Sequence, residues 1–148
     1  SRYLGKMFND EWMREKGFVE RSGLTAADLV ASGVSGELRS TQASEAVEAA
    51  VKLMRAHDFS QLSITHDRRL IGSLNEGHLY EQLVQHPEVI TSPVETIMQP
   101  AFPFVDITTS VDLLAPMITP TNRAVLVRDF KTDKTFIITR SDVIRVLC

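Results

Sequence analysis

The stretch SQLSITHDRRLIGSLNEGHLYEQL, residues 60–83, predicts the architecture of this chain. Its two short extended runs, 61–65 and 69–74, flank a turn-like HDR and are typical of a β-hairpin. Apolar residues at helical spacing predict one helix after the hairpin, at 77–84, and another before it, at 43–55. The predicted order is therefore helix, strand, strand, helix.

The second half of the chain repeats this order. NRAVLVRDFKTDKTFIITRSDVIRVL, residues 122–147, aligns with the first stretch at an offset of 62 to 64 residues, with two residues inserted in its hairpin. The predicted elements are a strand at 102–105, helices at 110–118 and 141–147, and strands at 124–128 and 135–138. Pro116 should kink or shorten the helix that contains it. The duplication indicates an α/β (α+β) fold of two small β-α-β-β-α units that pack against each other.

Further local signals mark the starts of shorter elements. NDEWMREKG, residues 9–17, predicts a short helix, and LTAADLV, residues 24–30, predicts a capped helical turn. A brief extended stretch is expected at 37–40. SPVE, residues 92–95, resembles a capping box with proline at the first helical position.

Composition narrows the class of protein. A chain of 148 residues, 43% of them hydrophobic, is long enough for one compact domain or two small units that share a core. The net charge of −3 gives no basic face, so nucleic acid is not an expected partner. One cysteine cannot form an internal disulfide, and no apolar run is long enough to span a membrane. We therefore expect a cytoplasmic protein without membrane contact.

Thr139 and Asp142 begin the last predicted helix, in the sequence TRSD. The threonine can cap this helix while the acid reaches back to the cap residue. The same oxygens, at a helix N-terminus, can instead bind the phosphate and ribose hydroxyls of a nucleotide. The spacing recurs in LTAADLV and in TTSVDLL, residues 108–114, so spacing alone does not choose. Both roles are compatible if Thr139 caps the helix and Asp142 is left free for a ligand.

Both halves resemble tandem CBS motifs, the paired unit also called a Bateman module. The resemblance rests on 47–54, SQLSI and LIGSLNEGHLYEQL in the first half, and on 111–118, RAVLV and FIITRSDVIRVL in the second. It covers about 36–148, with the first motif at 36–90 and the second at 91–148.

The N-terminal string YLGKMFNDEWMREKGF resembles the linker that follows the catalytic domain of cystathionine β-synthases. This resemblance implies that 1–35 is a helical linker and that the chain is the regulatory C-terminal region of such an enzyme. Pyridoxal phosphate would be confined to the catalytic domain, which is not in this chain, and the chain itself would hold no cofactor and have no activity. The expected partners are that catalytic domain and a second CBS module in a homodimer.

The resemblance also implies two clefts for adenosyl ligands such as S-adenosylmethionine, AMP, ADP or ATP. In one cleft Thr139 and Asp142 would clasp the ligand. The remaining positions that match this cleft are Phe59, Ser60, Gln61, Leu62 and Ile137. Phe59 is equally compatible with a place in the core, and a turn hydrogen bond would also explain Gln61.

The second cleft departs from the family pattern. Asn75 stands where the family has threonine, and His78 stands where it has aspartate. Neutral histidine is a poor substitute for a carboxylate that accepts two ribose hydroxyls at once. We therefore predict that the cleft of Asn75, His78, Arg123 and Ala124 is weak or empty, with Arg123 either filling it or binding an anion.

The sequence gives little support for a metal site or a phosphate-binding loop. The four histidines are too far apart for a metal-ligand pair, and there is no glycine-rich phosphate loop with lysine. Two hypotheses of different classes follow. The chain is either a sensor that binds an adenosyl ligand or a ligand-free structural module that only dimerises.

Overall fold

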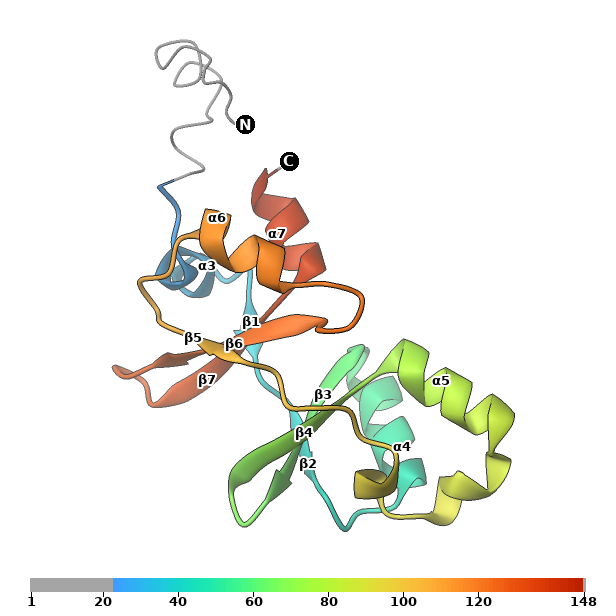
Figure 1. The fold of residues 1–148 in the computed structure, drawn as a ribbon. Coiled ribbons are helices and arrows are strands. Elements are labelled where there is room, and N and C mark those ends of the chain that lie inside the picture. Colours follow the sequence, from blue (N-terminus) through green and yellow to red (C-terminus); the bar gives the residue numbers. More distant parts are fainter. Residues whose placement is uncertain (1–22, 148) are drawn as a thin grey trace. The chain divides into compact units, whose positions relative to one another are not determined.

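The computed structural model describes residues 23–147 and divides them into two compact units (Figure 1). The first-repeat unit comprises 38–103, and the second-repeat unit comprises 23–37 together with 104–147. The predicted helix at 9–17 and the linker-like string at the N-terminus lie outside the described residues.

The first-repeat unit is a three-stranded sheet covered by helices, with strand order β2-β3-β4. Strand β2 is parallel to β3, whereas β3 and β4 form the predicted antiparallel hairpin. The elements are β2 (Ser40–Gln42), α4 (Val47–His57), β3 (Gln61–His66), β4 (Arg69–Asn75), α5 (Glu76–Gln85) and the 3-10 turns η1 (Pro87–Thr91) and η2 (Val94–Thr96).

Alternation along the strands gives this sheet one apolar and one polar face. Leu62, Ile64 and Leu74 are fully buried in a core with residues of α4 and α5. The alternate positions of β3 and β4 carry polar side chains instead. These are Gln61, Ser63, Ser73 and Asn75. Two candidate ligand residues, Gln61 and Asn75, therefore lie on the face opposite the core, whereas Leu62 lies in the core.

The second-repeat unit has a four-stranded sheet with strand order β1-β7-β6-β5. Its core joins Val125, Val127 and Ile138 of the hairpin to helix residues such as Leu29 and Leu114. The elements are α3 (Ala26–Ala31), β1 (Gly36–Glu37), β5 (Phe104–Val105), α6 (Val111–Leu114), the 3-10 turn η3 (Ala115–Met117), β6 (Ala124–Asp129), β7 (Lys134–Thr139) and α7 (Arg140–Leu147).

Each unit contains a segment that precedes the other repeat in sequence. The amide nitrogen of Ala26 donates to the carbonyl of Thr109 at 2.8 Å, so α3 packs with the second repeat. The amide nitrogen of Val94 donates to the carbonyl of Glu45 at 2.7 Å, so the segment after α5 packs with the first repeat. The compact units are consequently not the contiguous spans 36–90 and 91–148 of the sequence duplication.

Most predicted elements are confirmed, and two need correction. The helix predicted at 43–55 begins four residues later, because Ala43 instead donates its amide to the carbonyl of Thr65 at 2.8 Å. The capping box predicted at SPVE is wrong. Pro93 itself is the cap of η2 and no side chain bonds there, because the amides of Val94 and Glu95 donate to the carbonyls of Glu45 and Ala43 instead. Pro116 shortens its helix as expected, since α6 ends in a 3-10 turn.

Substitution of Gly72 tests how closely the segment after η2 packs against β4. A Cβ on residue 72 would lie 2.9 Å from Cγ of Met98 and 3.0 Å from the carbonyl oxygen of Gln99. We expect Gly72→Ala to lower the free energy of unfolding by about 1–3 kcal/mol, the cost of overpacking. Urea denaturation measures this change.

Two further variants make the Gly72 test specific. Gly36→Ala is the matched control, because a Cβ there would meet nothing within 4 Å. Met98→Ala should relieve part of the strain in the double variant. Equal stability of Gly72→Ala and wild type would contradict the described packing.

Candidate functional site

Strand β7 runs directly into helix α7, and Thr139 and Asp142 flank this junction. The amide nitrogen of Thr139 donates to Oδ2 of Asp142 at 2.9 Å. Asp142 is only 9% exposed. Within 23–147 no hydrogen bond engages Oγ1 of Thr139 or the second carboxylate oxygen, Oδ1, of Asp142. The acid thus reaches back to the residue before the helix, as the sequence predicted, whereas no cap bond to the Thr139 side chain is found among the described residues. Asp142 is therefore not wholly free for a ligand, because one of its two oxygens is engaged.

The other two copies of the T-x-x-D spacing behave differently. At α3 the capping box is reciprocal: Thr25 donates its amide to Oδ2 of Asp28 at 2.8 Å, and Asp28 donates its amide to Oγ1 of Thr25 at 3.4 Å. At α6 the cap is Ser110, whose Oγ accepts the amide of Leu113 at 3.3 Å. The TRSD copy thus differs from the α3 cap in two respects, since Asp142 is buried whereas Asp28 is exposed, and no reciprocal bond to the threonine hydroxyl is found among the described residues.

The corresponding residues of the first repeat are fully engaged by the chain itself. Oδ1 of Asn75 accepts the amide of His78 at 2.8 Å, and Nδ2 of Asn75 donates to Oε1 of Gln99 at 2.7 Å. Nε2 of His78 lies 2.8 Å from the carbonyl oxygen of Ile97, to which it donates. Asn75 is 5% exposed, so these are bonds of the unit's interior.

The other residues predicted for the adenosyl cleft take varied places in the first-repeat unit. Phe59 packs at the edge of the core and stacks on His57, with ring centroids 6.0 Å apart. Leu62 is a fully buried core residue. The carbonyl of exposed Ser60 accepts the amide of Glu76 at 3.0 Å.

Gln61 is the unusual member of this set. Its Oε1 atom is buried and has no hydrogen-bond partner among the described residues. A buried acceptor without a donor is costly, and native proteins rarely leave one without a reason. The same is true of Oγ of Ser63, two residues along the same face of β3, which the sequence analysis did not single out.

Ile137, Arg123 and Ala124 belong to the second-repeat unit. Ile137 lies two residues before Thr139 on the same face of β7, and Ala124 pairs directly with Thr139 across the hairpin. Nε of Arg123 donates to the carbonyl of Pro120 at 2.9 Å, a local turn contact. Both predicted clefts combine residues from the two units, so their assembly around a ligand remains a prediction.

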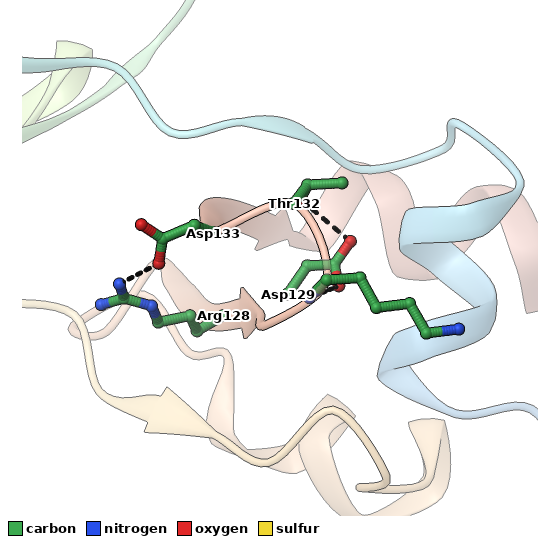
Figure 2. A network of polar contacts seen from close by, with 5 residues as sticks. Arg128, Asp129, Thr132 and Asp133 are labelled. Atoms are coloured by element: carbon green, nitrogen blue, oxygen red, sulfur yellow. Dashed lines mark hydrogen bonds and ion pairs between the residues drawn. The ribbon is translucent and has the colours of Figure 1, made fainter.

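A polar network orders the turn between β6 and β7, where the second repeat has its two extra residues (Figure 2). Arg128 pairs with Asp133. The carboxylate of Asp129 accepts two hydrogen bonds, one from the amide of Lys131 at 3.0 Å and one from Oγ1 of Thr132 at 3.1 Å. This turn lies at the opposite end of the hairpin from Thr139. The network therefore shapes a turn and is separate from the candidate site.

Between residues 23 and 147 no group of three or more His, Cys, Asp or Glu side chains comes together that could hold a metal ion. No helix in this part of the chain is long and apolar enough to cross a membrane.

Comparison with known proteins identifies the fold. No family model matches the chain. A cystathionine β-synthase from Dictyostelium discoideum is 26% identical over 156 residues, which cover 96% of this chain and only 29% of that relative. The chain therefore spans less than a third of the length of this relative.

Solved structures give a closer likeness in three dimensions. A CBS-domain containing protein from Agrobacterium tumefaciens superposes with a TM-score of 0.72 at 19% identity, covering 84% of this chain and 99% of that one. CBSX2 from Arabidopsis thaliana in complex with AMP gives 0.62 at 21% identity over 84% and 96% of the two chains. The CBS domain pair of MJ0100 in complex with 5′-methylthioadenosine and S-adenosyl-L-methionine gives 0.63 at 21% over 79% and 98%. The chain has the fold of a CBS-domain pair, as its sequence predicted.

Asp142 should contribute more to stability than Thr139. We expect Asp142→Ala to lower the free energy of unfolding by about 1 kcal/mol, because it removes the capping bond to the Thr139 amide. Thr139→Val should change it by less than about 0.5 kcal/mol, since its hydroxyl bonds no described residue. Thr25→Val is the control that should cost about 1 kcal/mol. Thermal or urea unfolding checks the order, and a larger loss for Thr139→Val than for Asp142→Ala would contradict it.

Proposed function

We propose that this chain is a regulatory CBS pair that binds one adenosyl ligand at Thr139 and Asp142. The observation that carries the proposal is the carboxylate of Asp142, which is nine-tenths buried and has one oxygen engaged by the chain. Its second oxygen can accept a hydroxyl, and charge-assisted bonds of this kind are stronger than neutral ones. A ribose offers two neighbouring hydroxyls, one for Asp142 and one for the hydroxyl of Thr139.

The class of ligand follows from chemistry and from the relatives. Two proteins that share the fold were solved with adenosine compounds, one with AMP and one with 5′-methylthioadenosine and S-adenosyl-L-methionine. In this chain Phe59 would supply apolar wall for the adenine, whereas the side chain of Leu62 is fully buried in the core and offers no surface to a ligand. The orphan acceptor of Gln61 would receive a hydrogen bond from the exocyclic amine of the base.

The regulated partner would be a pyridoxal-phosphate-dependent catalytic domain like that of cystathionine β-synthases. The Dictyostelium relative supports this, because most of its length lies outside the region that matches this chain. Ligand binding can change the activity of such a partner only if affinity differs between two arrangements of module and catalytic domain. We place no catalytic role in the chain itself.

Apolar residues on the outer sides of the helices favour a second role in dimerisation. On α5, Tyr80 and Val84 lie one turn apart and are 69% and 61% exposed. On α7, Ile144 is 52% exposed at the position that corresponds to Tyr80 in the duplication. A second CBS module of the same kind would bury both surfaces in a homodimer. Dimerisation without ligand is the alternative function.

Calorimetric titration with S-adenosylmethionine, AMP, ADP and ATP tests the ligand proposal. We expect one of them to bind in the micromolar to low millimolar range. Asp142→Asn should weaken binding by about tenfold or more, because it removes a charged acceptor while retaining an oxygen for the cap. Asp28→Asn, in the reciprocal capping box of α3, is the matched control and should bind as the wild type does. Absence of binding for all four compounds would refute the sensor for these ligands.

Size-exclusion chromatography with light scattering tests the dimer. We expect twice the mass of one chain for the wild type and a shift toward the monomer for Tyr80→Glu combined with Ile144→Glu, since each charge would be desolvated at an interface. Thr132→Glu, in the β6–β7 turn, is a control that adds one such charge away from these helices and should leave the mass unchanged. A wild type that is monomeric at all concentrations would count against this second role.

A further inference from the structure

The two repeats place equivalent residues at equivalent points of the fold. Ser73, Asn75 and His78 correspond to Ile137, Thr139 and Asp142, each pair 64 residues apart. In both repeats the first two residues end a strand and the third lies in the first turn of the following helix. Differences around these positions can therefore be compared directly.

A short segment pairs with the outer edge of the last strand in each repeat. Gln99 pairs with Ser73, with the two amide-to-carbonyl distances both 2.8 Å. Gly36 of β1 pairs with Ile137 of β7. Gln99 and Gly36 consequently hold the same position, and a side chain there faces the same side of the sheet as the cap residue two positions along.

In the first repeat, this position is filled. The side chain of Gln99 accepts a bond from Asn75 at 2.7 Å, and the carbonyl of Ile97 accepts one from His78 at 2.8 Å. Oγ of Ser73 also donates to the carbonyl of Pro100 at 2.6 Å, which fixes the segment to the strand. The polar groups with which this repeat would hold a ligand are bound to the chain itself.

In the second repeat, the same position is empty because residue 36 is glycine. A Cβ on Gly36 would meet nothing within 4 Å, and its backbone is not left-handed. The backbone therefore does not require glycine at this point. The hydroxyl of Thr139 and Oδ1 of Asp142 have no partner within the described residues, in contrast to Asn75 and His78.

We propose that Gly36 and Gln99 decide which repeat binds the ligand. The absence of a side chain at Gly36 leaves the Thr139 and Asp142 clasp open, whereas Gln99 occupies the corresponding clasp of the first repeat as an internal substitute for a ligand. The chain then binds one adenosyl compound, at the second repeat. This inference rests on the proposed function and identifies the two residues that restrict ligand binding to one site.

Gly36→Gln is the direct test, because it transfers the closing side chain to the open repeat. In calorimetric titration with the adenosyl compound that the wild type binds, we expect affinity to fall at least tenfold without a lower melting temperature. Glu37→Gln places the same side chain on the next residue, which pairs with Phe136 and faces the other side of the sheet. This control should bind as the wild type does. Wild-type affinity in folded Gly36→Gln would overturn the inference.

The reciprocal variant tests the first repeat. Asn75→Thr, His78→Asp and Gln99→Gly together give it the residues of the second repeat, and the stoichiometry should rise from one to two per chain. The same variant with Gln99 retained should stay at one. If the folded triple variant still binds one equivalent, Gln99 is not the group that closes the first repeat. Failure of the wild type to bind any adenosyl compound would instead refute the proposed function, so the two failures are distinct.

Discussion

Main-chain hydrogen bonding to a segment from outside the repeat is the constraint on which both units depend. A sheet of two or three short strands buries too little surface to be stable alone. The segment 92–100 completes the first repeat, and 23–37 completes the second. In each repeat this segment bonds to the start of a helix and pairs with the last strand of the hairpin. It therefore also determines which side chains lie beside the end of that strand. Stability and the candidate site thus rest on the same contacts.

The duplicated repeats differ in chemistry where a ligand would be held. Their hairpins and helices keep the same order, and their cores use the same kinds of aliphatic side chains. At the strand ends, however, one repeat has an amide and an imidazole that bond inward, and the other has a buried carboxylate with an unused oxygen. Divergence of this kind leaves a fold intact while it changes what the fold can bind.

The hairpins could be predicted because their pattern is local. Polar and apolar residues alternate in 61–65, and 124–127 is a continuous apolar run, so both specify strands. Apolar residues at helical spacing specify the helices. The role of Gln99 could not be predicted, because its contact with Asn75 joins residues 24 positions apart and no periodicity indicates it. The SPVE motif failed for a related reason, since long-range bonds to the start of α4 replaced the local cap. The bond from the Thr139 amide to Asp142 could be predicted from the local TRSD spacing, whereas the burial of Asp142 depends on tertiary packing that the spacing does not indicate.

The discontinuous second-repeat unit has a consequence for the order of folding. The first-repeat unit is one continuous stretch, 38–103, so it can form as soon as that stretch has been synthesised. The second-repeat unit must wait for β6, β7 and α7, and it has to close a loop that contains the entire first unit. Asp142 lies in this last portion. A nascent chain would therefore form the junction of β7 and α7 only after most of its architecture already exists.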